Sequence, residues 1–431
     1  MIERETEPLF TVIIPTKDRA EYLRHTLRTC SNQEYENLEI IVSDDGSSDN
    51  TEAVVLEAAR IDSRIRYVTP GNVGMRDNFE FALDQVKPGY VIALGGDDAI
   101  LPYGITQMWK ALKETGMEIL TWRPLMFAYP AVRSGIGQMG LYRPSASKLV
   151  KSVEYLDRQA TNLHYINDIE SPMFYIKGVV STKLIERVRS RTPEGRFYVC
   201  PTPDGYSGVV LAGEVEQYAF SGVPLSIAGA SPTSQGMAYL AEGEDGKKLS
   251  AHFYRTVSDV PMHKELASQP YSPLISLMTA DYLLTAKDLP GWPGRVPSID
   301  YKNLLLKGLG ELADGLYAED RLNRELAILD KVAKYHGLES FFRTKAKEIQ
   351  RHQPRKPFVG NGVTPGQILL NCDMFNIYNI FDASYVAYSA YQILPKISFS
   401  LLGRTVLNSL LYKRHQMRKG ISFPEESEWV D

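Results

Sequence analysis

The chain has 431 residues, of which 44% are hydrophobic and 23% charged, and its formal net charge at pH 7 is −4. This length exceeds one ordinary hydrophobic core and predicts two or three domains, while the small negative charge excludes a general attraction to nucleic acid. The three cysteines, Cys30, Cys200 and Cys372, stand far apart and in no metal-ligand spacing, which excludes a disulfide framework or a structural zinc site and fits a reducing, cytoplasmic location.

No targeting or membrane-spanning segment is predicted. The first five residues hold charged side chains and are not followed by a signal-peptide apolar stretch. No run of about 18 apolar residues occurs anywhere in the chain. We therefore expect a cytoplasmic protein.

Strands and helices alternate over the first hundred residues. Short apolar, β-branched runs predict four buried strands, at residues 10–15, 38–43, 65–68 and 90–94. Apolar residues at helical spacing predict the helices between them, at residues 20–30, 51–60 and 75–86, with Asp18 as a cap of the first. This alternation predicts an α/β fold, with a doubly wound, mainly parallel sheet and right-handed crossovers.

Three polar loops follow the first, second and fourth of these strands, at residues 16–19, 44–49 and 96–98. The carboxyl ends of parallel strands lie along one rim of the sheet, which is where open α/β sheets bind ligands. Asp97 and Asp98 are adjacent carboxylates, and such a pair needs a cation, a network of hydrogen-bond donors or open water to stay ionised. The alternative is an ordinary solvated turn, since Asp and Gly are common turn residues.

The pattern after residue 100 is less regular. A helix is predicted over residues 105–115 and a strand over 117–122, whereas residues 123–150 are rich in Pro, Gly and Ser and predict an irregular excursion. Later predictions are a strand at 173–176, helices at 182–190 and 209–216, and strands near 218–220 and 225–227. From about residue 245 the pattern is helical, with helices expected at 274–289, 299–317, 318–335 and 338–350.

The polar rim has the chemistry of a nucleotide site. No GxGxxG follows the first strand, which argues against a dinucleotide-dependent oxidoreductase, and no GxxxxGK[ST] is present, which argues against a P-loop enzyme. A nucleoside diphosphate fits carboxylates at the second and fourth strand ends. One carboxylate would accept from the base or ribose, and another would hold a divalent cation that bridges the two phosphates.

Four ordered motifs, at residues 12–16, 41–49, 71–74 and 96–102, resemble those of family 2 glycosyltransferases of GT-A fold. The resemblance covers residues 8–125 well and residues 165–235 more weakly. It implies a GT-A sheet with a nucleotide-binding half at 1–125, an acceptor-binding and catalytic half at 126–240, and a helical carboxyl-terminal region at 245–431.

The resemblance also implies roles for individual residues. The region of Pro15 and Thr16, together with Asp45, would contact the nucleobase, and Asp44 would support that loop or approach the ribose. A DXD-type site would follow, with Asp97 near the ribose and Asp98 as the ligand of Mn²⁺ or Mg²⁺. The remaining candidate donor contacts are Asn72, Gly74 and Arg76. Gly96 stands where many relatives have another Asp, which places one metal-side contact in doubt.

An inverting glycosyl transfer needs a base at the acceptor hydroxyl, and Asp204 is the candidate because residues 203–207 resemble the family's catalytic stretch. The rivals are Asp168 and Glu170, and the bland alternative for Asp204 is a helix cap. Three further polar residues, Ser231, Thr233 and Ser234, stand where relatives carry a loop near the diphosphate or acceptor. Two lone histidines, His164 and His252, are best explained as structural residues.

The resemblance implies metal-dependent transfer of a sugar from a nucleoside-diphosphate sugar to a saccharide or lipid-linked acceptor, in bacterial surface-polysaccharide assembly. A sugar nucleotidyltransferase and a non-catalytic sugar-nucleotide-binding protein remain alternatives. Residues 397–411 are apolar and precede a basic cluster, Lys413, Arg414, Arg418 and Lys419. Peripheral docking on the inner face of a membrane and packing on protein, including a second copy in a homo-oligomer, both fit this tail.

Overall fold

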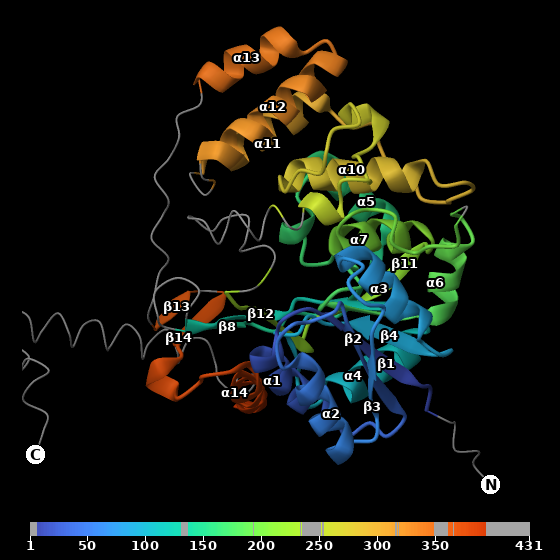
Figure 1. The fold of residues 1–431 in the computed structure, drawn as a ribbon, viewed down its shortest axis with the longest axis vertical. Coiled ribbons are helices and arrows are strands. Elements are labelled where there is room, and N and C mark those ends of the chain that lie inside the picture. The colour runs from blue at the N-terminus through green and yellow to red at the C-terminus, as the bar shows by residue number, and fades with distance from the viewer. Residues whose placement is uncertain are drawn as a thin grey trace, which may run out of the picture.

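We used a computed structural model of the chain, which describes residues 7–130, 137–192, 194–232, 234, 251, 254–314, 317, 319–348, 361–364 and 366–393. Two sheets with helices packed around them form the lower part of the view in Figure 1, and helices from the second half of the chain lie above them.

The first four strands of the larger sheet are parallel, as the alternating pattern predicts. They are β1 (Phe10–Thr16), β2 (Leu38–Asp44), β3 (Ile65–Val68) and β4 (Tyr90–Ala93), in the spatial order β3-β2-β1-β4. The register pairs Thr16 with Asp44 and Ile13 with both Ile41 and Ala93. The carboxyl ends of β1, β2 and β4 are therefore neighbours on one rim.

Helices cover both faces of this sheet (Figure 1), which confirms the doubly wound arrangement. Phe10, Val12 and Ile14 of β1 face α1 (Ala20–Ser31), α2 (Thr51–Ile61) and α4 (Gly104–Thr115). Ile13 faces the opposite side, where α3 (Met75–Asp84) packs. Burial on both faces explains why β1 is a continuous apolar run rather than an alternating one.

Four strands from later in the chain complete the larger sheet. In spatial order they are β10 (Gly178–Ser181), β6 (Ile119–Trp122), β11 (Gln217–Ser221) and β9 (Lys148–Lys151). β10 runs antiparallel to both β4 and β6, so the sheet is parallel only in its first half and at the β6–β11 pair. The strand predicted at residues 173–176 is wrong, since β10 begins at Gly178 and these residues form the turn before it.

The second sheet has the order β13-β14-β8-β7-β12-β5. Its strands are β5 (Ala99–Ile100), β7 (Leu125–Ala128), β8 (Gln138–Tyr142), β12 (Ser226–Ala230), β13 (Gly362–Thr364) and β14 (Gln367–Asn371). Residues 123–150 were expected to be irregular, yet they contribute β7, β8 and β9. β7 and β8 pair with each other, but their other partners, β12 and β14, and the partner of β9, β11, lie far along the chain, beyond the reach of a local pattern.

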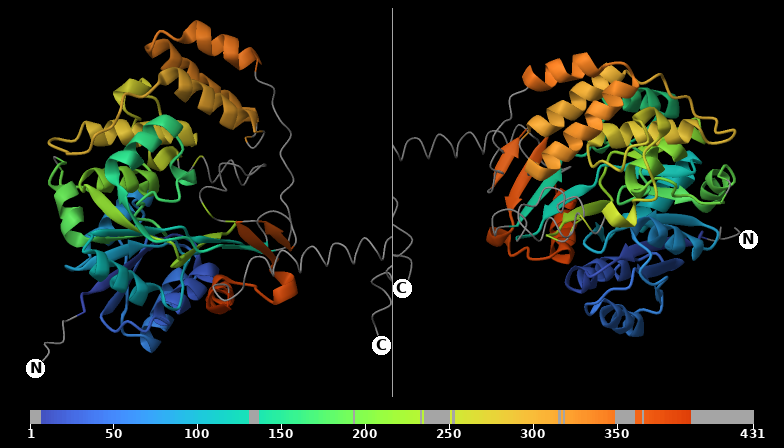
Figure 2. Two further views of the ribbon diagram at one scale, coloured as in Figure 1. Left: turned by 180° about the vertical axis from the view of Figure 1, so that it is seen from behind. Right: turned by 45° about the horizontal axis from the view of Figure 1, so that its top comes forward.

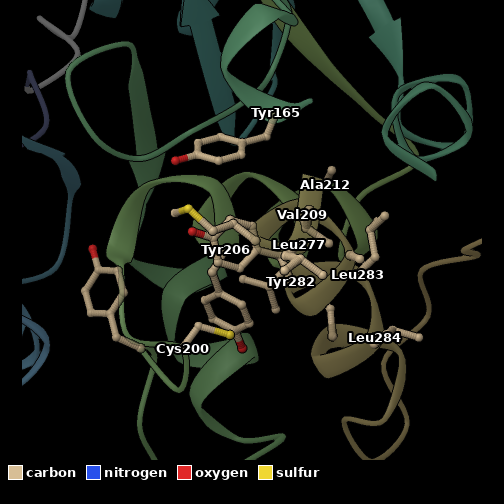
Figure 3. Packing of buried hydrophobic residues seen from close by; sticks show 14 of the residues in the cluster. Tyr165, Cys200, Tyr206, Val209, Ala212, Leu277, Tyr282, Leu283 and Leu284 are labelled. Atoms are coloured by element: carbon tan, nitrogen blue, oxygen red, sulfur yellow. The ribbon is translucent and has the colours of Figure 1, made fainter. Parts of the chain in front are cut away.

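Among the described residues, seven helices that follow residue 150 lie on the side of the larger sheet that carries Ile13. They are α5 (Ser152–Asn162), α6 (Thr182–Arg189), α7 (Pro203–Gly213), α10 (Ile275–Lys287), α11 (Tyr301–Ala313), α12 (Glu319–Tyr335) and α13 (Glu339–Glu348). The last three form an outer layer beyond α10 (Figure 1). Figure 3 shows α7 against α10, with Tyr206, Val209, Leu277 and Tyr282 in one apolar cluster. The expected helices of residues 274–348 are confirmed.

The last described helix, α14 (Ile380–Ile393), does not join α10–α13 but packs on the second sheet and beside α1, as both views of Figure 2 show. Three short 3₁₀ turns complete the description, η2 (Tyr165–Asn167), η3 (Lys264–Leu266) and η4 (Asp373–Phe375). Within the described ranges, none of the helices combines the length and the apolar character that crossing a membrane requires. The basic tail lies outside these ranges.

Candidate active site

Asp44 and Asp45 end β2 and have different surroundings. Asp44 accepts hydrogen bonds from Ser47 N at 2.9 Å and Tyr67 OH at 2.9 Å, so it shapes its own loop. Asp45 reaches across to the loop after β3 and accepts from Val73 N at 2.7 Å and Gly74 N at 2.9 Å. Gly74 has a φ of +91°, a conformation that side chains disfavour, so glycine is needed there. Asp45 therefore joins the second and third loops.

Lys17 was missed by the sequence analysis. Its Nζ donates to Asp45 O at 3.1 Å and to Asn72 Oδ1 at 2.5 Å, which brings the loop after β1 into the same cluster. Thr16, one residue earlier, is buried, and its Oγ1 has no hydrogen-bond partner among the residues that the structure describes. Pro15 pairs in register with Ser43 of β2. The predicted nucleotide-contacting residues of these loops thus lie together.

Arg76 is on α3, just after Gly74, and its guanidinium pairs with Asp77 at 3.0 Å and Asp259 at 3.7 Å. Neither acid belongs to the rim. The expected cap of α1 also differs: Asp49, not Asp18, accepts from Ala20 N, at 2.9 Å. Asp18 instead has a φ of +49° and accepts from Ser48 N.

Asp97 is 2% exposed and has a partner on each oxygen. Its Oδ1 accepts from Arg19 Nη1 at 2.7 Å. Its Oδ2 accepts from Ser231 Oγ at 2.6 Å and Ser234 Oγ at 2.7 Å, from the loop after β12. Ser231 and Ser234, expected near a diphosphate or acceptor, thus hold Asp97, while Thr233 and His252 lie outside the described residues. The Arg19 contact was not predicted.

Asp98 is 1% exposed and is held by two backbone amides. Gly95 N donates to its Oδ2 at 2.6 Å and Gly229 N to its Oδ1 at 2.9 Å. Burial, with the charge of Asp97 adding to it, raises the pKa of Asp98 to about 7. A carboxylate this costly to ionise favours a bound cation, which would supply the missing positive charge.

Oxygen atoms crowd the face of Gly95 that lacks a side chain. A Cβ at this position would lie 2.6 Å from Tyr175 OH, 2.8 Å from Asp98 Oδ2 and 3.1 Å from Asp97 Oδ1. Any side chain larger than hydrogen would therefore collide with the two carboxylates. Carboxylate oxygens suit Mg²⁺ and Mn²⁺, which take few protein ligands and complete their shell with water and phosphate oxygens. Among the described residues, no group of three or more His, Cys, Asp or Glu side chains surrounds such a site.

Gly96 has a physical reason to lack a side chain. A Cβ there would lie 2.9 Å from Thr16 Oγ1 and 3.3 Å from Arg19 Cδ. The Arg19 side chain fills the space into which a third carboxylate of the loop would extend. A side chain at residue 96 would therefore displace Thr16 or Arg19.

Asp204 lies in the first turn of α7, after Pro203, a helix start of the kind that its sequence indicates. Tyr165 OH donates to its Oδ2 at 3.1 Å, while its buried Oδ1 has no hydrogen-bond partner among the described residues. Burial raises the pKa of this carboxyl above the usual range. It is therefore a stronger base than an exposed Asp, with one oxygen available to accept a proton.

The two rivals for the base are committed elsewhere. Asp168 accepts from Arg158 Nε at 3.0 Å and Gln159 Nε2 at 2.9 Å, and Glu170 pairs with Arg158 at 3.0 Å and Lys148 at 2.5 Å. This is an ion-pair network between α5 and the chain before β10. His164 lies beside it in sequence and contacts Asn167 at 3.2 Å. Neither rival has the orphaned oxygen that distinguishes Asp204.

Comparison with known proteins finds relatives for the amino-terminal part of the chain. Residues 11–125 match the profile of Glycosyl transferase family 2. Over 109 residues the chain is 36% identical to GalNAc(5)-diNAcBac-PP-undecaprenol beta-1,3-glucosyltransferase of Campylobacter jejuni, covering 25% of this chain and 35% of that protein. Over another match of 109 residues it is 31% identical to Glycosyltransferase GlyA of Streptococcus pneumoniae, covering 25% and 16%.

The chain thus matches about a third or less of each of these two relatives. A solved structure, S. aureus TarS 1-349 in complex with UDP-GlcNAc, overlays with a TM-score of 0.42 at 15% identity, covering 78% of this chain and 92% of that chain. This overlay is too loose to support an argument. All three rim loops lie within residues 11–125, the segment that matches the profile of Glycosyl transferase family 2.

Proposed function

We propose that the protein transfers a sugar from a nucleoside-diphosphate sugar to a hydroxyl of a saccharide or lipid-linked acceptor, with inversion at the anomeric carbon. The observation that carries the proposal is that the site contains two carboxylates in different surroundings. Asp98 is buried on two amides beside the carboxylate of Asp97, and Asp204 has an orphaned oxygen and a raised pKa.

In this proposal the acceptor hydroxyl gives its proton to Asp204 Oδ1 as its oxygen attacks the anomeric carbon. The bond from that carbon to the diphosphate oxygen breaks, and the nucleoside diphosphate leaves with the bonding electrons. Asp98 would hold Mn²⁺ or Mg²⁺, which would supply positive charge against the leaving diphosphate. The phenol of Tyr165 donates to Asp204 Oδ2 and so leaves Oδ1 as the oxygen that faces the acceptor.

In this proposal the amino-terminal loops bind the nucleotide. We assign Pro15, Thr16 and Asp45 to the nucleobase, Asp44 and Asp97 to the loop and ribose, and Asn72, Gly74 and Arg76 to the remaining donor contacts. Residues 1–125 then bind the donor, residues 126–240 bind the acceptor and hold the base, and residues 245–431 add a carboxyl-terminal region. Its helices α10–α13 are appended, whereas β13, β14 and α14 belong with the second sheet. The orphaned Thr16 Oγ1 supports a ligand at this rim.

The nucleotidyltransferase alternative is less well supported. Its basic loop after the first strand would bind a triphosphate, but Lys17 is engaged by Asp45 and Asn72, and Arg19 pairs with Asp97. A lipid-linked acceptor in surface-polysaccharide assembly is supported by the name of the Campylobacter relative. With such an acceptor the protein would work in the cytoplasm at the inner membrane face.

The test is release of nucleoside diphosphate from a panel of UDP- and GDP-sugars, with and without Mn²⁺. Metal-dependent cleavage of one donor supports the proposal, and pyrophosphate from a nucleoside triphosphate and a sugar phosphate supports the alternative. Asp98→Ala should abolish turnover and weaken donor binding, whereas Asp204→Asn should abolish turnover and spare donor binding. Asp281→Asn, at a buried carboxyl on α10, is the matched control and should turn over normally at pH 7.

The tail and the oligomeric state need separate measurements. Co-sedimentation of the full chain with anionic phosphatidylglycerol vesicles tests peripheral membrane contact, and light scattering tests homo-oligomer formation. Binding that vanishes when Lys413, Arg414, Arg418 and Lys419 are replaced by Gln would support the membrane proposal. Salt-independent self-association that needs residues 397–411 would support packing on a second copy.

A further inference from the structure

Tyr175 belongs to the turn that leads into β10, and in sequence it lies between Asp98 and Asp204. Its backbone forms an isolated bridge with Ala93, the last residue of β4, just before the loop of Asp97 and Asp98. Its hydroxyl lies 2.6 Å from the position that a Cβ of Gly95 would occupy, next to Asp98 Oδ2 at 2.8 Å from the same point. A tyrosine that no motif marks therefore reaches the centre of the site.

The backbone at this point is strained. Ile176 has a φ of +65°, which a β-branched residue seldom adopts. Lys177 N donates to Tyr175 O at 2.8 Å, so Ile176 is the central residue of a three-residue turn of the rare, strained kind. Ile176 N and O are also fixed, by Ala93 O at 2.8 Å and Ser226 Oγ at 2.7 Å. Strain held in place this firmly is common where a side chain must be aimed.

The phenol faces negative charge. The carboxylates of Asp98, Asp97 and Asp204 all act on Tyr175, and together with burial, the largest cause, they raise its pKa well above 10. Among the described residues the hydroxyl makes no hydrogen bond, so it is a donor without an acceptor.

A transferred sugar would lie within reach of this donor. The proposed function places the leaving diphosphate at Asp98 and the attacking hydroxyl at Asp204, and the sugar ring must connect them. Tyr175 is under the influence of both carboxylates. Its ring packs edge-on to Phe79 of α3, with ring centroids 6.0 Å apart, which restricts its rotation.

Resting on that proposed function, we infer that Tyr175 is a sugar-binding residue, whose hydroxyl donates a hydrogen bond to the sugar of the donor substrate. It selects for a donor with an acceptor oxygen at that point of the ring. It does not hold the nucleotide, which lies with the loops after β1, β2 and β3.

The experiment compares Tyr175→Phe with Tyr155→Phe, using the nucleotide sugar that the wild-type protein cleaves fastest in the panel. Tyr155 is also a buried tyrosine, on α5, and its hydroxyl lies 2.9 Å from Ser171 Oγ, outside the residues assigned to the site. For Tyr175→Phe, affinity for the nucleoside diphosphate with Mn²⁺ should stay within twofold, while affinity for the nucleotide sugar and kcat/KM should each fall about tenfold. Tyr155→Phe should match the wild type in all three.

Each other outcome has a definite meaning. If wild-type protein is active and Tyr175→Phe behaves like Tyr155→Phe, the inference is wrong and the proposed function stands. Equal loss of nucleoside diphosphate and nucleotide sugar binding would make Tyr175 a structural residue, which also overturns the inference. A wild-type protein that cleaves no donor overturns the proposed function, and the inference with it.

A second variant tests the turn without removing the phenol. Ile176→Gly relieves the positive φ, because glycine adopts it without strain. The thermal midpoint should not fall, yet the hydroxyl is aimed less firmly, so nucleotide sugar affinity should fall while nucleoside diphosphate affinity stays constant. An unchanged nucleotide sugar affinity would contradict the role given to the turn.

Discussion

Arg19 Nη1 donates to Asp97 Oδ1 across 2.7 Å, and this ion pair joins the loop after β1 to the loop after β4 in a setting where Asp97 is 2% exposed. The charge of Asp97 raises the pKa of Arg19 even though burial acts in the opposite direction. A fixed cation of the protein is therefore part of the proposed donor site. It partly offsets the charge of the adjacent carboxylates.

Removal of this guanidinium should destabilise the fold. Arg19→Ala leaves Asp97 buried with an uncompensated charge, a change that costs about 3–5 kcal/mol in proteins. Urea unfolding should show this loss, and a double-mutant cycle with Asp97→Asn should recover most of it. Additive effects of the two substitutions would contradict a direct ion pair.

Gly95→Ala should abolish sugar transfer. The added Cβ would meet Tyr175 OH at 2.6 Å and Asp98 Oδ2 at 2.8 Å, where a cation would bind. Gly310→Ala is the matched control, because a Cβ on this residue of α11 meets nothing within 4 Å. It should leave turnover unchanged and stabilise the helix by about 0.5–1 kcal/mol. Activity retained in Gly95→Ala would place the reaction elsewhere.

The pH profile should report Asp204. The base works only when deprotonated, so kcat/KM should fall as pH falls through the pKa of Asp204, which burial raises above the usual range for Asp. The acid limb should therefore lie at higher pH than an exposed Asp would give. Asp168→Asn should keep this limb in place, because Asp168 is bound to Arg158 and Gln159. If Asp168→Asn shifts the acid limb of the profile, the assignment of the base to Asp204 is wrong.

Stability should depend on pH through Asp281, away from the site. Burial raises its pKa to about 7, and its carboxylate accepts from His263 N at 2.6 Å. Because the folded pKa is higher than the unfolded one, the stabilisation is complete below the unfolded pKa and is lost as pH rises through about 7. Its full size is at most about 4 kcal/mol. Thermal unfolding at pH 5 and 8.5 should show the loss, and Asp281→Asn should remove it.

Much of the amino-terminal half followed from local pattern. Apolar runs such as residues 10–15 bury both faces of a strand, and the polar loops after them must share a rim. Asp44, Asp45, Asp97 and Asp98 could be brought together on that basis alone. The strand after residue 173 was misplaced because Tyr175 to Lys177 has β-like composition but turns sharply.

Contacts made at long range could not be predicted. β8 pairs with the nearby β7 but also with β14, more than two hundred residues later, and no local pattern signals this second partner. Lys17 and Arg19 appeared to be ordinary loop cations, and only the fold brings them to Asp45 and Asp97. Ser231 and Ser234 were expected near the diphosphate or acceptor, whereas in the structure they donate to Asp97. Tyr175 carried no signal in the sequence.

Some of the donors that hold Asp97 and Asp98 come from Gly229, Ser231 and Ser234, over 130 positions later in the chain. During synthesis on the ribosome, residues 11–125 emerge long before these partners exist. One oxygen of each acid must then stay hydrated until β12 arrives to close the rim. A fragment of residues 7–130 should accordingly leave these oxygens in water and bind no donor, so residues 11–125 are only part of a functional unit.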